Sequence, residues 1–299
     1  MKGPSSPAAP QRPKVALVIG SGALKCIAAF GVMKVLRREN VPIDMVVACS
    51  GGAFCATWVA GGGEGVLEDR VEQLLIGWRA AMGRVSFRTL LRFLFPRLSR
   101  ASGRVGLVDD RKLNEVLREW VGDSRFEDLP IPMHLVATDY RTGEQVVLSK
   151  GPLRDAIRST ISVPIMFAPW AVDGRELVDG AVCDPLPVDI AIREGADVII
   201  AMGFEATLEK DLRPALGRVM HLQSLVVNQL LRAQYAFYNL SHHAELVPII
   251  PEFDQPVGMR DLHLVPHLLQ RGAEAAEREM PYIRRLLQPV NPRAREDAR

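Results

Sequence analysis

The fold is decided by residues 14–54, which read KVALVIGSGALKCIAAFGVMKVLRRENVPIDMVVACSGGAF. The run Lys14–Ile19 is almost wholly apolar, which is typical of a strand buried on both faces of a parallel sheet. Helical periodicity follows from Lys25 to Arg38, and a second apolar run comes at Met45–Cys49. Two parallel strands need a crossover connection, which is usually a helix. This order therefore predicts a strand–helix–strand unit.

The rest of the chain continues this alternation. Further strands are predicted at Met133–Ala137, Gln145–Leu148, Glu176–Val178, Asp197–Met202 and Leu246–Ile250. Helices are predicted at Arg111–Val121, Pro152–Ser159, Val188–Arg193, within Leu216–Leu240, and at Leu264–Glu279 and Tyr282–Leu287. The pattern predicts an α/β fold with a single doubly wound, mainly parallel sheet flanked by helices, and with a helical C-terminal tail.

Composition excludes several classes of protein. Of 299 residues, 48% are hydrophobic and 24% are charged, as in globular proteins, and 37 basic against 35 acidic residues leave a net charge of +2. We expect no nucleic-acid partner, because no global basic field exists. No apolar run approaches the ~20 residues of a membrane-spanning helix, and residues 1–14 lack the apolar segment of a secretory signal. A cytoplasmic location is expected.

The cysteines give no sign of a metal centre. Cys26, Cys49, Cys55 and Cys183 show neither the Cys-x-x-Cys spacing nor a paired Cys/His spacing of zinc sites. We therefore expect reduced structural thiols, and no metal or other cofactor.

A serine stands where the second predicted strand turns into the next helix, in Ala48-Cys49-Ser50-Gly51-Gly52. This is the G-x-S-x-G nucleophile elbow with alanine in place of the first glycine. Small residues two before and two after the serine are needed because strand and helix approach closely there. The same pattern also suits an ordinary strand–helix turn with a serine N-cap.

Two further motifs accompany the serine. The loop Gly20-Ser21-Gly22-Ala23-Leu24-Lys25 matches neither dinucleotide nor P-loop fingerprints. Its backbone N–H groups would face the same end of the sheet as Ser50, where an oxyanion hole belongs. The second motif is Asp179-Gly180-Ala181, whereas Asp173-Gly174 more closely fits a hairpin turn.

Together these motifs resemble the patatin-like phospholipases, a family of lipid acyl hydrolases with a Ser–Asp dyad. The resemblance covers about Lys14 to Gly203 and rests on the order and spacing of four stretches. They are IGSGALKCIAAFGVMKVL, ACSGGAF, LVATDYRTGEQVVLSKGPLRDAIRSTISVPIMFAPW and ELVDGAVCDPLPVDIAIREGADVII. The resemblance implies hydrolysis of phospholipid or lysophospholipid acyl esters by a bacterial single-domain member.

The same resemblance assigns roles to residues. It makes Ser50 the nucleophile and Asp179 its base. It also gives an oxyanion hole of Gly20, Ser21, Gly22 and Ala23, an elbow of Ala48, Gly51 and Gly52, and supporting positions at Lys25, Gly180 and Ala181. The expected ranges are a flexible arm at 1–13, the catalytic domain at 14–204, a helical extension packed on it at 205–289, and a frayed tail at 290–299.

The sequence departs from the family's glycine pattern at four positions. Ser21, Ala23, Cys26 and Ala48 stand where the family usually has glycine. Each keeps its backbone N–H donor, but a positive φ would cost a residue with a side chain about 1 kcal/mol or more. We therefore expect the activity to depend on whether the backbone at these positions can adopt the conformation that glycine usually provides.

Two other functions fit the same residues. A Ser-His-Asp hydrolase would use Ser50, Asp179 and a later histidine such as His242, His263 or His267, in the chain order of α/β-hydrolases. Alternatively, a lipid-binding or regulatory protein on the same fold would bind lipid without turnover, because fold does not dictate function.

A basic segment predicts membrane contact. Between Arg84 and Arg104 there are several arginines and no acidic residue, and apolar residues from Phe87 to Leu98 recur at helical spacing. A basic amphipathic helix can lie at an anionic membrane, where Arg88, Arg92 and Arg97 would meet headgroups. The alternative is a helix that packs on the domain with solvated arginines.

Overall fold

The computed structural model describes residues 12–63, 67–81, 106–108, 110–208, 213, 215–240 and 244–288. In this part of the chain the strands are β1 (Val15–Ile19), β2 (Met45–Cys49), β3 (Met133–Asp139), β4 (Gln145–Leu148), β5 (Trp170–Val172), β6 (Arg175–Asp179), β7 (Val198–Met202) and β8 (Glu245–Pro248). The α-helices are α1 (Ala28–Arg38), α2 (Gly52–Ala60), α3 (Leu67–Ala81), α5 (Asp110–Val121), α6 (Leu153–Thr160), α7 (Val188–Arg193), α8 (Ala215–Leu240) and α9 (Val265–Leu286).

These strands form one mixed, mainly parallel sheet. Its order is β5-β6-β3-β2-β1-β7-β8, with β4 paired to β3 outside this path. Strands β1, β2, β3, β7 and β8 are mutually parallel, whereas β4 and β6 run antiparallel to β3. The chain steps from β1 to one side and later returns to the other side, so the sheet is doubly wound as the sequence predicts.

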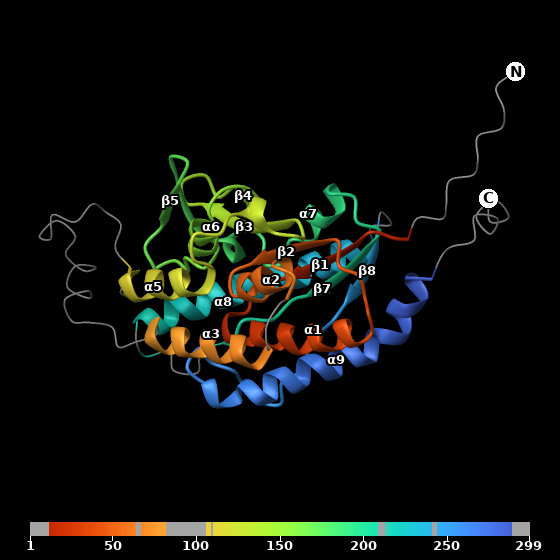
Figure 1. Ribbon diagram of the computed structural model, residues 1–299. Coiled ribbons are helices and arrows are strands. Elements are labelled where there is room, and N and C mark those ends of the chain that lie inside the picture. The colour runs from red at the N-terminus through yellow and green to blue at the C-terminus, as the bar shows by residue number, and fades with distance from the viewer. Residues whose placement is uncertain are drawn as a thin grey trace, which may run out of the picture.

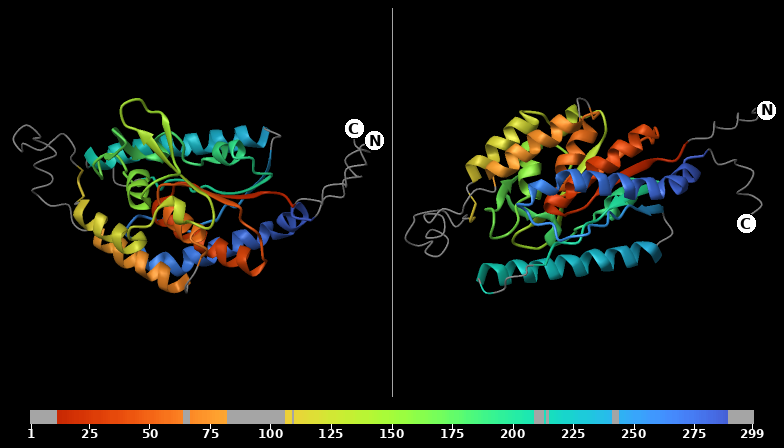
Figure 2. Two further views of the ribbon diagram at one scale, coloured as in Figure 1. Left: turned by 45° about the horizontal axis from the view of Figure 1, so that its top comes forward. Right: turned by 90° about the horizontal axis from the view of Figure 1, so that it is seen from below.

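Helices cover both faces of this sheet (Figure 1). Alternate residues of β1 enter different cores: Leu17 packs in the cluster that contains α1, α2 and α9, and Val18 packs in the cluster that contains α7 and part of α8. Figure 2 shows α8 on one side of the sheet and α1 with α9 on the other. The continuous apolar strands of the sequence are thus explained by burial on both faces.

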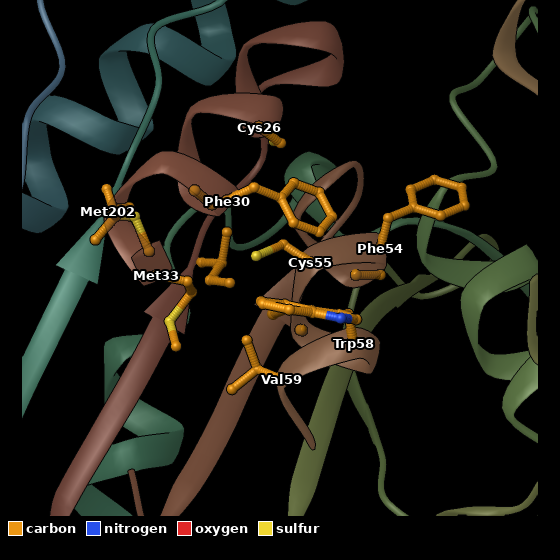
Figure 3. Packing of buried hydrophobic residues seen from close by; sticks show 14 of the residues in the cluster. Cys26, Phe30, Met33, Phe54, Cys55, Trp58, Val59 and Met202 are labelled. Atoms are coloured by element: carbon orange, nitrogen blue, oxygen red, sulfur yellow. The ribbon is translucent and has the colours of Figure 1, made fainter. Parts of the chain in front are cut away.

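The larger core includes buried side chains of α1, α2 and β7 (Figure 3). Phe30 of α1 and Trp58 of α2 meet there with ring centroids 5.7 Å apart. Burying an aromatic side chain of this size contributes about 2 kcal/mol or more relative to exposure. This packing fixes α2, and hence the turn before it, against the sheet.

Most predicted elements are confirmed to within a few residues. The Asp173-Gly174 turn joins β5 to β6, and its φ angles of 49° and 77° are the left-handed pair that a type I′ hairpin requires. Strand β8 adds to the sheet beside β7. All four cysteines are free thiols.

The C-terminal helix corrects one prediction. Two helical segments were expected on either side of Pro281, but α9 runs unbroken from Val265 to Leu286 with the proline inside it. Met280 and Ile283 are both buried and hold the helix on the core across the proline. Proline removes one N–H donor, and the residue four before it, Glu277, is exposed, so water can satisfy its carbonyl.

Candidate active site

Ser50 occupies a strained turn between β2 and α2. Its φ of 53° lies in the left-handed region, where a residue with a side chain is held at a cost of about 1 kcal/mol. Its N–H donates to Thr160 Oγ1 at 2.8 Å, and that hydroxyl in turn donates to the carbonyl of Val136. The turn is therefore anchored to β3 by a buried threonine.

Strand β6 brings Asp179 to the same point. On one edge of β3, Cys49 at the end of β2 pairs with Val136, and Asp179 at the end of β6 pairs with the next residue, Ala137. Strand β4 occupies the opposite edge of β3 at both positions. Strands β2 and β6 therefore run toward each other along one edge of β3, and their ends meet.

The meeting of these ends produces a direct contact between two buried side chains. Ser50 Oγ donates to Asp179 Oδ2 at 2.6 Å, and the other carboxylate oxygen accepts the N–H of Ala181 at 2.9 Å. Asp179 is only 2% exposed. Desolvation raises the pKa of Asp179 to about 7, although the hydrogen bonds from Ser50 and Ala181 oppose this rise. A carboxylate in this state is a far stronger base than one in water.

The glycines around the turn are required by close backbone contacts. A Cβ on Gly51 would lie 2.7 Å from the Ala23 carbonyl oxygen, and one on Gly52 would lie 2.5 Å from that of Ile19. A Cβ on Gly180 would collide with the Val136 carbonyl. The backbone around Ser50 and Asp179 therefore has no room for a side chain at these three glycines, whereas Ala48 lies fully buried within β2.

The loop after β1 supplies fewer free donors than expected. The N–H of Gly20 donates to Met202 O at 2.8 Å, and that of Ser21 donates to Pro185 O at 2.9 Å. The N–H groups of these two residues therefore hold the loop in place, and the four-residue oxyanion hole inferred from the sequence stays a prediction. Gly22 and Ala23 line the cavity with Ser50, and no described group accepts from their N–H groups.

Ala23 carries the strain that the glycine replacements suggested. Its φ of 48° is left-handed, whereas Cys26 lies in the short 3-10 helix Ala23–Ile27 and keeps a negative φ. The side chain of Cys26 is buried and faces the Gly20 carbonyl at 3.5 Å. Replacing the family's glycine therefore strains the backbone at Ala23 but not at Cys26.

Sequence reasoning missed the residues that hold the pair in place. Thr160 binds the Ser50 N–H, and Thr138 Oγ1 donates to the carbonyl of Asp179 at 2.9 Å. The carbonyl of Ser162 accepts the N–H of Asp179 at 2.9 Å. The stretch RSTISVP was part of the resemblance, and its polar residues within an apolar context were the available signal.

Two cavities meet at Ser50. One, of about 690 Å³, is lined by both polar and apolar groups, including Gly22, Lys25, Ser50 and Asp179. The other, of about 50 Å³, is narrow and almost wholly apolar, and it runs between α3 and α5. Besides Ser50, the narrow pocket is lined by Ala23, Gly51, Phe54, Leu74, Gly77, Trp78, Leu113, Val116, Ile161, Val163, Phe167 and Met259.

Lys25 places a cation in the wall of the larger cavity. Its Nζ donates to the carbonyl of Glu205 at 2.6 Å and lies 5.9 Å from the ring centroid of Phe253. Desolvation lowers the pKa of this ammonium, since burial disfavours the charged form. Lys25 therefore ties the loop after β1 to the segment after β7.

No described histidine stands at the serine. His263 and His267 line neither cavity, and His267 Nε2 lies 3.7 Å from the Asp254 carboxylate. Asp179 receives the Ser50 hydroxyl directly, so the geometry leaves no place for a histidine between them. His242 lies outside the described residues.

Three other predicted features also fall outside the described residues. They are the basic segment with Arg88, Arg92 and Arg97, nearly all of the N-terminal arm, and the tail at 290–299. Membrane contact by that segment stays a prediction, as do the range boundaries. Among the described helices, none is both long and apolar enough to cross a membrane.

The chain is similar to several solved structures. VipD from Legionella pneumophila superposes with a TM-score of 0.46 at 15% identity, covering 90% of this chain and 67% of that one. The type III effector protein ExoU gives a TM-score of 0.40 at 12% identity, covering 94% of this chain and 54% of that one.

Sequence relatives are more similar. An uncharacterized NTE family protein of Mycobacterium tuberculosis is 34% identical over 232 residues, which are 77% of this chain and 59% of that protein. Human patatin-like phospholipase domain-containing protein 6 is 30% identical over 200 residues, 66% of this chain and 14% of that protein. The neuropathy target esterase sws of Drosophila melanogaster is 28% identical over 201 residues. The match thus spans only part of each relative's length.

The family assignment rests on a match across most of the sheet. The sequence profile described as "Patatin-like phospholipase" matches residues 17–192, a range that contains both Ser50 and Asp179. The chain therefore belongs to the patatin-like phospholipase family.

Proposed function

We propose that this protein is a serine acyl hydrolase that cleaves lipid acyl esters, with Ser50 as nucleophile and Asp179 as its base. The observation that carries this proposal is the 2.6 Å hydrogen bond from Ser50 Oγ to a buried carboxylate whose pKa is raised to about 7. A base with a pKa near the working pH combines a useful ionised fraction with enough basicity to take the hydroxyl proton.

The reaction proceeds in two steps at this pair. Asp179 takes the proton as Ser50 Oγ attacks the ester carbonyl, and the tetrahedral intermediate then expels the alcohol, which recovers the proton from Asp179. Water attacks the acyl-serine next, gives its proton to Asp179, and releases the fatty acid when Ser50 Oγ takes that proton back. The strained φ of Ser50 keeps its hydroxyl at the cavity wall throughout.

The negative charge on the intermediate has donors beside it. Gly22 and Ala23 line the cavity with Ser50, no described group accepts from their N–H groups, and α2 begins two residues after the serine. Helix N-termini favour negative charge, and a single oxyanion donor is commonly worth ~10²–10³ in kcat. We assign the oxyanion hole to Gly22 and Ala23.

The two cavities support a lipid substrate. A narrow apolar pocket suits one acyl chain, while the larger cavity has room for the rest of a lipid and carries the Lys25 ammonium for an anionic phosphate. Relatives named as a phospholipase-domain protein and an esterase agree with this substrate class.

A fluorophosphonate probe tests the proposal. The intact protein should be labelled at Ser50, Ser50→Ala should lose the label, and a panel of phospholipid, lysophospholipid and simple acyl esters should show turnover. Absence of both labelling and turnover in the intact protein would favour the lipid-binding alternative. Labelling at another serine would overturn the assignment of the nucleophile.

A further inference from the structure

Helix α8 exposes a row of large apolar side chains. Leu222, Val226 and Phe237 are 62%, 58% and 66% exposed. They are four and eleven residues apart, which is about one and three helical turns, so all three lie on one side of the helix. Val219 and Leu225 are also exposed and extend the row. We call Val219, Leu222, Leu225, Val226 and Phe237 the outer stripe. Large apolar side chains gathered on an exposed face are typical of an interaction site.

The opposite side of the same helix belongs to the active-site cavity and the core. Met220, Gln223, Ser224 and Val227 line the larger cavity together with Ser50, while Leu231 is buried against the sheet. Figure 2 shows α8 running along the outer edge of the molecule. A helix with its side chains is about 10 Å across. A surface that contacts the outer stripe is therefore about 10 Å from the cavity on the other side of α8.

The charges on α8 indicate what kind of partner the outer stripe binds. Residues 215–240 contain Arg218 and Arg232 but no aspartate or glutamate. Arg232 binds Glu205 at 2.8 Å, and the sequence just before the helix carries both signs, with Glu209, Lys210, Asp211 and Arg213. An apolar stripe with basic neighbours and no carboxylate in its helix is complementary to an anionic lipid surface.

A second copy of the chain fits this face less well. A two-fold interface on this face would pack α8 against the α8 of a second copy, so Arg218 and Arg232 of both copies would enter the same interface. The helix itself offers no acidic side chain for these cations, and Glu205, which lies outside the helix, already binds Arg232. Charge complementarity therefore favours lipid over self-association.

We propose that the outer stripe of α8 docks this protein on anionic lipid surfaces, with the helix lying flat in the headgroup boundary. This inference rests on the proposed function, since a membrane-embedded substrate then enters the cavity across the wall that α8 forms. It is separate from the sequence-based prediction for Arg88, Arg92 and Arg97.

The test compares two matched double variants of the whole chain. Leu222→Ser/Phe237→Ser removes one aliphatic and one aromatic group from the stripe, and Ile76→Ser/Tyr140→Ser removes a similar pair, 65% and 59% exposed, elsewhere. Sedimentation with vesicles of phosphatidylcholine containing phosphatidylglycerol should show binding weakened about tenfold or more by the first variant only. Hydrolysis of a short water-soluble ester should be unchanged in both.

Each contrary result is informative. Equal vesicle binding by wild type and the stripe variant overturns the proposal, as does equal binding to neutral and anionic vesicles. A wild-type dimer that the stripe variant converts to a monomer would assign the face to a second copy. If only Arg88→Gln/Arg92→Gln/Arg97→Gln weakens binding, docking belongs to the basic segment. Stripe-dependent binding by a protein without esterase activity would instead overturn the proposed function and leave the docking in place.

Discussion

Ser50 and Asp179 share a 2.6 Å hydrogen bond although 129 residues separate them in the chain. Each residue lies where a strand ends, and the two strands approach each other along a single edge of β3. The pair is thus positioned by backbone pairing, and Thr160 and Thr138 fix the two ends to their surroundings.

Ser50→Ala and Asp179→Asn should each abolish hydrolysis, and the double variant should be no worse than either single variant. Non-additivity is expected because the two side chains act as one unit. Steady-state kinetics with a soluble ester provide the measurement. His263→Ala and His267→Ala are the controls, and a histidine variant as inactive as Ser50→Ala would restore the Ser-His-Asp alternative.

The activity should rise with pH through a single ionisation near 7. Desolvation raises the pKa of Asp179 to about 7, and only its ionised form can accept the Ser50 proton. The pH dependence of kcat/KM for the soluble ester reports this ionisation in the free enzyme. A profile that is flat from pH 5 to 8, which spans ~3 units around that value, would contradict the role of Asp179 as base.

Asp179→Asn should stabilise the fold at alkaline pH. The folded-state pKa of Asp179, about 7, exceeds the unfolded value of ~3.9. The contribution of this carboxyl group to the free energy of unfolding is therefore most favourable below ~3.9 and falls as pH rises toward 7. Above 7 the charged, buried carboxylate costs up to about 4 kcal/mol, since one pKa unit is ~1.4 kcal/mol. Asparagine can still accept the Ala181 N–H and lacks that charge.

Thermal unfolding of the two proteins at pH 5 and pH 8 measures this effect. The Tm advantage of Asp179→Asn should be larger at pH 8. An equal Tm difference at both pH values would show that Asp179 does not titrate between pH 5 and pH 8, and so would contradict its raised pKa.

Ala23→Gly should raise kcat, and Ala23→Val should lower it by about tenfold or more. Glycine adopts the observed φ of 48° without strain, whereas a β-branched residue resists it and would displace the oxyanion donor. Cys26→Gly is the matched control, because Cys26 keeps a negative φ and should gain nothing in kcat. If kcat is unchanged in both Ala23 variants, the backbone N–H of Ala23 is not an oxyanion donor.

Val116→Phe should shift specificity toward short acyl chains. Val116 lines the narrow apolar pocket between α3 and α5, so a larger side chain occupies the space proposed for the acyl chain. Loss of room for even one methylene is worth roughly tenfold or more in discrimination. The measurement is the ratio of kcat/KM for long-chain and short-chain esters, and Leu113→Ala should move that ratio the other way.

Much of the fold was predictable because its signals are local. The apolar run of β1, the helical period after it and the apolar run of β2 each follow from burial on one or both faces. The continuous helix α9 was not predictable, because Pro281 locally disfavours a helix and only the burial of Met280 and Ile283 overrides it.

Residue types at short spacings were enough to predict the sheet, the turn at Ser50 and the family. Three features appear only when the chain is folded: the contact of Ser50 with Asp179, the backbone acceptors of the Gly20 and Ser21 N–H groups, and the position of α8 in the cavity wall. These features depend on strand register and on which groups a fold buries together. Register and burial are properties of pairs of distant residues, and no local pattern encodes them.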